Sequence, residues 1–310
     1  MTTTRRRAGL GCLAVLAALA AAAPAEATFP GRNGAIAFGH SASSGEPEPV
    51  DTRGLAVVAP GATEERVLIE CELTGGEPSG GDCAVASFTD PSYSADGRLI
   101  VFDAGERLAI VNADGSGLRL LPATTADDGD PAFAPGGRRI VFTGENDRGS
   151  TDVYVRRLGG GPARVVAHDA SEPAWSSRNT LAYVRELNIY RVPAAGGRRR
   201  LVTAGVSPDW SPDGRRLLLI RPKPNVPVPG LTGRIYVVGA RGGGLRRISS
   251  GNSLSNPVWS PDSRWFAYDG FDLGIHKRRL AGGRARVVSA SQIGSEGAFV
   301  ASFDPTWRPR

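Results

Sequence analysis

The chain has 310 residues, with 37 lysines and arginines against 31 aspartates and glutamates, a formal net charge of +6. This length is ample for one large closed domain or two small ones. The positive excess is modest and is no polyanion-binding signature, so we expect no nucleic-acid partner. Nearly all of the positive charge is arginine, which a GC-rich coding sequence explains as readily as phosphate recognition.

Residues 1–27 have the composition of a signal peptide. Three arginines at positions 5–7 precede an apolar run over residues 8–23, and Ala25-Glu26-Ala27 is a small-residue cleavage site. The run is short for a membrane span, and no later segment approaches the roughly eighteen apolar residues that a span needs. We therefore expect a chain that is secreted or exported to the periplasm or cell envelope, with no membrane span after cleavage.

A four-residue phrase, with a proline in second place and an aromatic residue in fourth, occurs six times. Successive prolines lie 40, 42, 35, 49 and 48 residues apart. A period in this range, made of short strands, is the signature of a propeller blade. The sequence therefore predicts an all-β fold, a six-bladed β-propeller with four-stranded antiparallel blades. The copies of the phrase are Asp90-Pro91-Ser92-Tyr93, Asp130-Pro131-Ala132-Phe133, Glu172-Pro173-Ala174-Trp175, Ser207-Pro208-Asp209-Trp210, Asn256-Pro257-Val258-Trp259 and Asp304-Pro305-Thr306-Trp307.

Each phrase is the first, innermost strand of a blade and is followed by a turn and three short apolar runs. A turn such as Ser211-Pro212-Asp213-Gly214 has the residues that preset turn dihedrals and a positive φ. Glycine-rich hairpins separate the third strands from arginine-led outer strands. Second strands are predicted at 100–102, 140–142, 181–183, 217–219 and 266–268, third strands at 108–111, 153–155, 189–192, 235–238 and 273–276, and outer strands at 119–121, 164–166, 200–202, 247–248 and 286–288.

The two ends of the predicted domain, residues 28–310, are complementary halves of one blade. Residues 31–38 read as a first turn and a second strand without an inner strand, whereas residues 303–307 read as an inner strand with nothing after it. We expect residues 303–310 to pair with residues 35–39. Such a closing blade, shared by the N- and C-terminal strands, leaves no free sheet edge inside the ring.

The Trp-Ser-Pro-Asp-Gly-Arg-Arg-Leu segment at 210–217 and the glycine-led hairpins resemble the repeats of the TolB-like six-bladed propeller family, also called WD40-like or PD40 repeats. The resemblance covers essentially all of the chain after the signal peptide. It implies the fold, whereas the role stays open, because that fold hosts periplasmic scaffold proteins, regulatory domains of peptidases and some lyases. We expect no counterpart of the separate N-terminal domain that precedes the propeller in TolB.

Cys71 and Cys83 are the two cysteines after the signal peptide. In an oxidising compartment, an isolated pair twelve residues apart is most simply a disulfide that closes a local loop. Two free thiols are the alternative, and no second cysteine or histidine nearby completes a zinc site.

The face that carries the connections into the first strands, which we call the top face, is predicted to carry the ligand site. Long connections at 41–53, 144–151 and 221–233, together with 70–89 and 289–302, all fall on this face. The residues before the repeat prolines should surround the mouth of the central channel, with Asp209 one step inside in blade 5. The predicted site therefore comprises Asp90, Asp130, Glu172, Asp209, Asn256 and Asp304.

A ring of carboxylates at a channel mouth would attract a cation, either calcium or an arginine or lysine of a partner. The alternative is that each carboxylate only initiates its strand by capping local backbone amides. The three histidines, His40, His168 and His276, lack metal-ligand spacing and are expected on the surface or in loops. No Gly-x-Ser-x-Gly nucleophile motif is present.

We therefore expect an exported, monomeric, non-enzymatic binding or scaffold propeller that recognises a protein, a peptide or an envelope glycan on its top face. The alternative is an enzyme at the channel mouth, such as a polysaccharide lyase or a lactonase-like hydrolase. It requires carboxylates and a histidine to converge on one ion. A regulatory subunit of a separate envelope enzyme is a third possibility.

Overall fold

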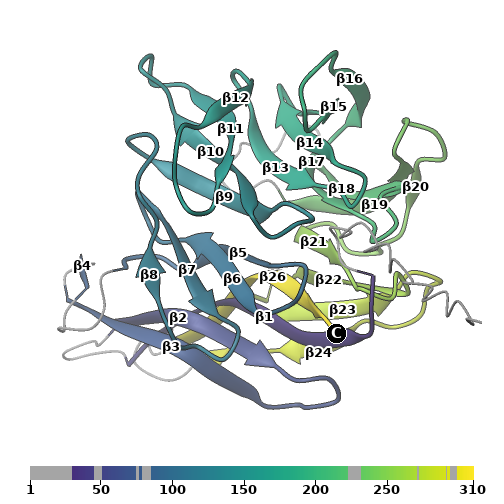
Figure 1. The fold of residues 1–310 in the computed structure, drawn as a ribbon. Helices are drawn as coiled ribbons and strands as arrows, with labels where there is room; N and C mark the ends of the chain where they lie inside the picture. Colours follow the sequence, from purple (N-terminus) through teal and green to yellow (C-terminus); the bar gives the residue numbers. More distant parts are fainter. Residues whose placement is uncertain are drawn as a thin grey trace, which may run out of the picture.

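The computed structural model describes residues 30–44, 51–74, 77–78, 85–222, 232–270, 272–290, 292–293 and 299–310. Within these ranges the protein is all-β, and six antiparallel sheets are arranged as the blades of a ring (Figure 1). No described helix is long and apolar enough to cross a membrane. The predicted six-bladed propeller is confirmed.

In each of blades 2 to 6 the four strands follow one another along the chain from the inner to the outer strand. Blade 2 contains β5 (Thr89–Tyr93), β6 (Leu99–Asp103), β7 (Leu108–Asn112) and β8 (Arg119–Leu120). Blade 3 contains β9 (Asp128–Phe133), β10 (Arg139–Glu145), β11 (Thr151–Arg157) and β12 (Arg164–Ala167), and blade 4 contains β13 (Ser171–Trp175), β14 (Thr180–Arg185), β15 (Asn188–Pro193) and β16 (Arg200–Ala204). Blade 5 contains β17 (Val206–Trp210), β18 (Arg216–Pro222), β19 (Gly233–Gly239) and β20 (Arg246–Arg247), and blade 6 contains β21 (Ser255–Trp259), β22 (Trp265–Asp269), β23 (Ile275–Arg279) and β24 (Arg286–Ser289).

Blade 1 is the closing blade, and it joins the two ends of the described chain. Its four main strands are β26 (Phe299–Pro309), β1 (Asn33–Ser43), β2 (Asp51–Val58) and β3 (Glu65–Thr74), flanked by the two-residue strands β25 (Gln292–Ile293) and β4 (Glu77–Pro78). The yellow β26 lies beside the purple β1 in Figure 1, with Ile36 opposite Trp307. The indole of Trp307 also donates a 3.2 Å hydrogen bond to the carbonyl oxygen of Gly34. The predicted pairing of the two ends of the chain is confirmed. Both paired strands are longer than expected.

The turn after the inner strand owes its shape to short side-chain hydrogen bonds. In blade 2 the Ser94 hydroxyl donates to Asp96 Oδ1 at 2.6 Å and accepts from the Leu99 N–H at 3.0 Å, while Gly97 has a φ of 65°. A left-handed residue at this place favours glycine, because other side chains are strained there. Ser211 with Asp213 and Ser260 with Asp262 repeat the 2.6 Å hydroxyl bond.

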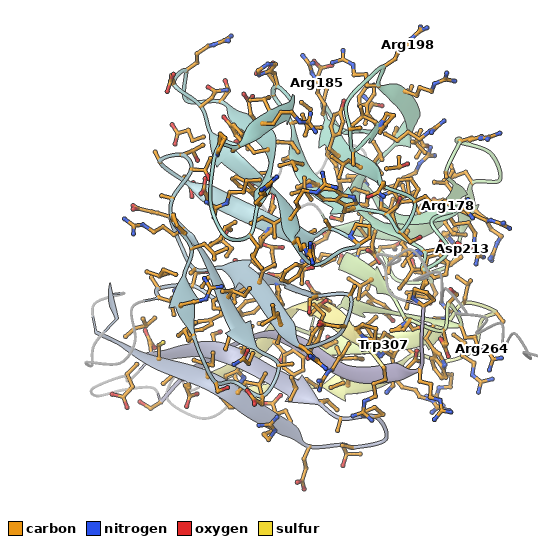
Figure 2. All side chains as sticks on the ribbon, in the orientation of Figure 1. Arg178, Arg185, Arg198, Asp213, Arg264 and Trp307 are labelled. Carbon is orange, nitrogen blue, oxygen red and sulfur yellow. The ribbon has the colours of Figure 1, made fainter. Side chains whose placement is uncertain are left out.

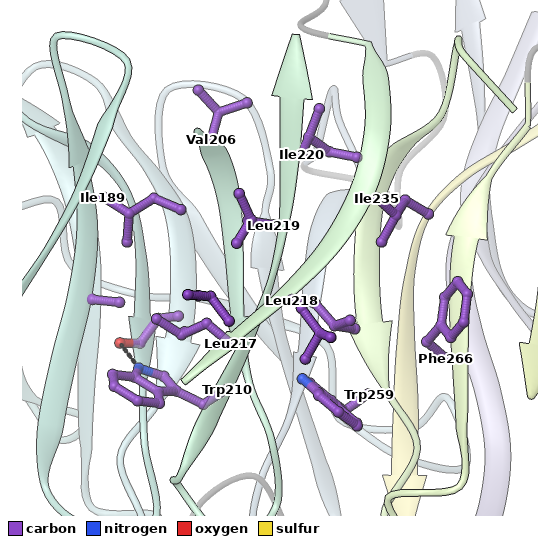
Figure 3. Close-up of a cluster of buried hydrophobic side chains, with 14 of the residues drawn as sticks. Ile189, Val206, Trp210, Leu217, Leu218, Leu219, Ile220, Ile235, Trp259 and Phe266 are labelled. Carbon is purple, nitrogen blue, oxygen red and sulfur yellow. Dashed lines mark hydrogen bonds between the residues drawn. The ribbon is translucent and has the colours of Figure 1, made fainter. Parts of the chain in front are cut away.

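The core lies between neighbouring blades, because the second strands have buried apolar side chains on both faces and pack against strands of the adjacent blades. Figure 3 shows the cluster around blade 5, where Leu217 and Leu219 pack on one side and Leu218 and Ile220 on the other. Trp210 joins two blades through a 3.3 Å hydrogen bond from its indole to the Ala174 carbonyl oxygen. The four inner-strand tryptophans, at 175, 210, 259 and 307, are all buried, as the sequence predicted.

Two local expectations need correction. The third strand of blade 6 is Ile275–Arg279 instead of 273–276, because Leu273 has a φ of 57° in the tight turn that Gly270 and Gly274 close with a 2.9 Å backbone hydrogen bond. The long top connection expected over 41–53 is partly strand, since β1 continues to Ser43 and β2 begins at Asp51. Residues 45–50 lie outside the described residues.

The disulfide between Cys71 and Cys83 stays a prediction. Cys71 is buried in β3, where it joins the apolar cluster between blades 1 and 2. Cys83 lies outside the described residues.

Candidate functional site at the channel mouth

All six residues before the repeat prolines have a left-handed backbone, with φ between 44° and 53°. Such values are uncommon for residues other than glycine and cost on the order of 1 kcal/mol each. The register of every inner strand also shifts at this point, for example between the pairs Thr89–Asp103 and Ser92–Val101. The extra residue on the inner strand forms a β-bulge, which bends the strand and redirects the side chain. The six residues are Asp90, Asp130, Glu172, Ser207, Asn256 and Asp304.

These bulges surround a cavity of about 590 Å³ at the mouth of the channel. Every one of the six inner strands contributes its proline phrase to the wall, and Thr232 and Ser255 complete it. Five carboxyl groups line the cavity, and none of its described lining residues is a lysine, arginine or histidine. The predicted site residues are thus brought together as expected: Asp90, Asp130, Glu172, Asp209, Asn256 and Asp304.

The carboxylates bind backbone N–H groups of the next blade. The Asp90 N–H donates to Asp304 Oδ2 at 3.3 Å, and the Glu172 N–H donates to Asp130 Oδ2 at 3.2 Å. The Ser207 N–H donates to the Glu172 carboxylate in the same manner. The carboxylates thus accept hydrogen bonds from backbone amides, but these amides belong to the neighbouring blade and not to the local turn that the capping alternative expected.

Asn256 and Asp209 make different contacts. The Asn256 amide donates to Asp269 Oδ2 at 2.8 Å and also to the Asp304 carboxylate. Asp209 Oδ2 accepts a 2.7 Å hydrogen bond from the Trp259 N–H of blade 6. Asn256 thus bridges two carboxyl groups, whereas Asp209 links blade 5 to blade 6.

Burial raises the pKa of every carboxyl group in the mouth. Desolvation is the largest cause in each, and it raises the pKa of Glu172 and of Asp209 to about 7. The pKa of Asp90 lies well above its usual value because burial is reinforced by the charges of Asp304 and Asp130. The pKa of Asp304 rises to about 6, where the hydrogen bond from the Asp90 N–H opposes the burial.

Two carboxyl groups behind the cavity wall were not among the site residues predicted from the sequence. Asp103 ends β6 opposite Thr89, and Asp269 ends β22 opposite Ser255, so both stand beside the bulges. Burial raises the pKa of Asp103 to about 7 and the pKa of Asp269 well above its usual value. The signal was present, since an aspartate directly follows the predicted second strand in these two blades.

The mouth can therefore hold positive charge, and its own charge depends on pH. Carboxyl groups with a pKa of about 6 or 7 are partly protonated at neutral pH and become anionic as the pH rises. No group of three or more His, Cys, Asp or Glu side chains that could hold a metal ion occurs in the described part of the chain. The geometry suits an organic cation that donates several hydrogen bonds.

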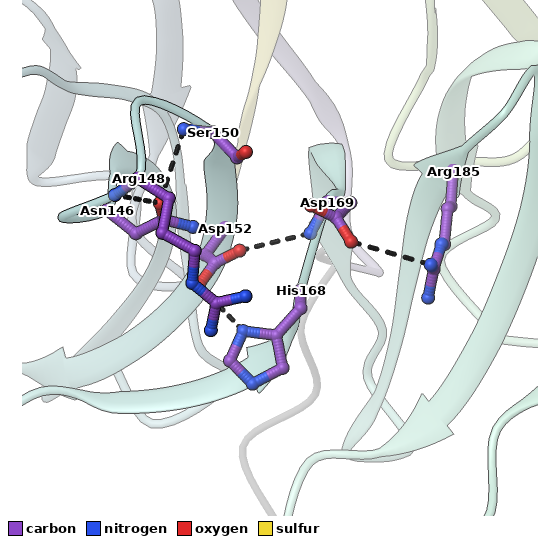
Figure 4. Close-up of polar contacts among 7 residues, drawn as sticks. All are labelled: Asn146, Arg148, Ser150, Asp152, His168, Asp169 and Arg185. Carbon is purple, nitrogen blue, oxygen red and sulfur yellow. Dashed lines mark hydrogen bonds and ion pairs between the residues drawn. The ribbon is translucent and has the colours of Figure 1, made fainter.

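The histidines lie away from this cavity. His40 is buried in β1, with Nδ1 3.5 Å from Glu65 Oε1, so the expectation that it is a surface or loop residue is wrong. His168 is exposed and its Nδ1 lies 2.8 Å from Asp152 Oδ2 (Figure 4). His276, on β23, lies 2.8 Å from Asp272.

Comparisons with known proteins agree with this architecture. No protein-family model matches the chain. YuxL of Bacillus subtilis, an uncharacterised peptidase, is 28% identical over 212 residues, which are 60% of this chain and 30% of YuxL, so the chain spans less than a third of that relative. A protein assigned as TolB from Agrobacterium tumefaciens superimposes with a TM-score of 0.63 at 17% identity over 88% of this chain and 99% of that one.

TolB from Acinetobacter baumannii superimposes with a TM-score of 0.53 at 13% identity over 84% of this chain and 80% of that one. Identities this low show the fold alone. The chain therefore has the TolB-like six-bladed propeller fold that its repeats resemble.

Proposed function

We propose that this chain is an exported, monomeric, non-enzymatic binding propeller, which takes a positively charged group of a protein or peptide into its channel mouth. The observation that carries the proposal is the convergence of five carboxyl groups on one cavity with no basic side chain in its described wall. The export signal of residues 1–27 and the Cys71–Cys83 disulfide belong to the same proposal.

A guanidinium or ammonium group suits this cavity better than a neutral glycan. Half-buried carboxylates form strong charge-assisted hydrogen bonds with such donors, whereas a neutral sugar leaves their charges uncompensated. The strained bulges support a binding role, because strain that the surrounding structure maintains is concentrated at functional sites. All six pre-proline residues carry that strain.

The enzyme alternative required a histidine beside the carboxylates. The three histidines instead contact Glu65, Asp152 and Asp272, none of which lines the mouth. A general acid or base role would therefore rest on the carboxyl groups alone, and we favour the binding role.

The test is calorimetric titration of the full chain with a short acetylated peptide amide that has one central arginine. The citrulline peptide is the matched control, because it keeps the shape and removes the charge. We expect binding of the arginine peptide at pH 8, weaker binding at pH 5, and at least about a ten-fold loss in the Asp130→Asn/Asp304→Asn variant.

The control variant is Asp114→Asn/Asp147→Asn, which removes two exposed carboxylates outside the mouth. It should bind the arginine peptide as the unmodified chain does. Equal affinity for the arginine and citrulline peptides, or equal losses in the two variants, would refute the proposal.

A further inference from the structure

The end of the ring opposite the mouth is one continuous layer, which we call the base. It consists of the turns between first and second strands and the hairpins between third and fourth strands. Within a blade the two are hydrogen-bonded, for example from the Leu158 N–H to the Arg138 carbonyl oxygen at 2.9 Å and from the Leu280 N–H to the Arg264 carbonyl oxygen at 2.8 Å. Arg178 Nε donates to the Asp213 carbonyl oxygen at 2.7 Å and so links the turns of blades 4 and 5.

The base of blades 3 to 6 is rich in exposed arginines. Arg178, Arg198 and Arg264 all lie along the right-hand side of the view in Figure 2. The carboxylates of this region are engaged in their own turns, as Asp213 Oδ1 accepts from the Ser211 hydroxyl at 2.6 Å and from the Arg215 N–H at 3.0 Å. Among described residues, the base has a single ion pair, Arg98 with Asp96 at 4.0 Å. Most of its positive charge is therefore not compensated by ion pairs within the described chain.

A cavity of about 480 Å³ opens within this layer between blades 5 and 6. Arg246, Arg264 and Arg279 line it together with Trp265 and Asp262, whose Oδ1 is bonded within its own turn by the Ser260 hydroxyl and the Arg264 N–H. The guanidinium carbons of Arg279 and Arg286 lie 5.0 and 5.2 Å from the centre of the Trp265 ring, a cation–π distance that holds both side chains in place. Planar guanidinium groups that converge on one cavity are suited to a phosphate.

We propose that the base docks the propeller on an anionic phospholipid surface, with the Trp265 cavity holding one headgroup phosphate. A bilayer fits better than a linear polyanion because the arginines extend over the turns and hairpins of four blades and do not follow one groove. The acidic mouth is at the other end of the ring. An anionic surface therefore attracts the base and repels the mouth, which orients the channel away from the membrane.

The test is sedimentation of the full chain with vesicles of phosphatidylglycerol and phosphatidylcholine, against vesicles of phosphatidylcholine alone. The neutral vesicles measure the contribution of the apolar N-terminal residues to vesicle binding. We expect binding to the anionic vesicles at 0.1 M salt and its loss at 0.5 M, because screening shortens the reach of surface charges. Arg241 is an exposed residue of the β19–β20 hairpin in the base of blade 5. The Arg241→Gln/Arg264→Gln variant should bind about 30-fold more weakly, since each basic residue near such a surface contributes about 1 kcal/mol.

The matched control is Arg107→Gln/Arg148→Gln, which removes two exposed arginines from the other end of the ring. It should retain full binding. Equal binding to neutral and anionic vesicles, or equal losses in the two variants, would overturn the proposal. Tight binding to soluble polyphosphate or duplex DNA without vesicle binding would overturn it too, and would assign the base to a polyanion instead.

Discussion

The carboxylate of Asp304, on the last strand, accepts a hydrogen bond of 3.3 Å from the backbone N–H of Asp90, which lies 214 positions earlier in the chain. The contact joins the closing blade to blade 2. Glu172 makes the same contact with Asp130 at 3.2 Å. Each such bond links neighbouring blades through a half-buried carboxyl group of the mouth, so ring stability and mouth charge are coupled.

The stability of the protein should fall as the pH rises. Carboxyl groups whose pKa is raised by folding, such as Glu172 and Asp209 at about 7, bind protons more tightly in the folded chain than in the unfolded chain. Between about pH 4 and pH 7 the folded state therefore holds more protons, and the free energy of unfolding decreases with pH. We expect a thermal midpoint several degrees lower at pH 8 than at pH 5. A midpoint that rises over this range would contradict the raised pKa values.

Asp90→Asn should remove part of that pH dependence. The side chain of Asp90 is half-buried among like charges, and the amide has no charge to desolvate. The variant should melt several degrees above the unmodified chain at pH 8 and at the same temperature at pH 3, below the pKa of an unfolded aspartate. Asp147→Asn, at an exposed position, is the control and should change neither midpoint. An equal shift at both pH values would indicate a packing effect.

Trp307→Ala should weaken the ring closure. Trp307 is 7% exposed, packs between blades 1 and 6 and bonds the Gly34 carbonyl oxygen. Loss of a buried tryptophan costs about 3–5 kcal/mol, which urea unfolding at fixed pH would measure. Leu201→Ala, at a position that is 57% exposed, should cost less than about 0.5 kcal/mol. Similar losses in both variants would mean that β26 is not needed for closure.

Gly39→Ala should destabilise the closing blade because there is no room for a side chain. A Cβ atom at Gly39 would lie 2.5 Å from the Phe88 carbonyl oxygen and closer still to the Phe303 ring. We expect a loss of about 1–3 kcal/mol in urea unfolding, the range for overpacking. Gly136→Ala, whose Cβ would meet nothing within 4 Å, is the control and should be nearly neutral. A neutral Gly39→Ala would show that β26 shifts easily against β1.

Calcium should leave the thermal midpoint unchanged, and so should EDTA. No three metal-ligating side chains of the described residues lie close enough together to share an ion. A ligand bound only by the folded state would raise the midpoint. A rise of several degrees with calcium, absent in Asp130→Asn/Asp304→Asn, would instead make the mouth a metal site.

The sequence by itself determined the blade count, the strand order and the closing blade. These features follow from local chemistry, since the Pro-x-aromatic strand, the Ser-x-Asp-Gly turn and the apolar second strand each act over a few residues, and the repeat multiplies a weak local signal by six. The six predicted mouth residues followed from the same repeat. Leu273 shows the limit, because only packing determined that it turns instead of extending.

The tertiary structure alone decided which charges meet. Asp103 and Asp269 lie behind the wall of the mouth, and Asn256 bridges Asp269 to Asp304, through contacts between strands and blades that no local pattern encodes. Their raised pKa values depend on burial, which is a property of the closed ring. The arginines look evenly spread along the chain, yet turns and hairpins from four blades bring many of them, such as Arg178, Arg198 and Arg264, to one end. Composition gives the net charge, whereas only the fold places the acidic mouth and the arginine-rich base at opposite ends of the ring.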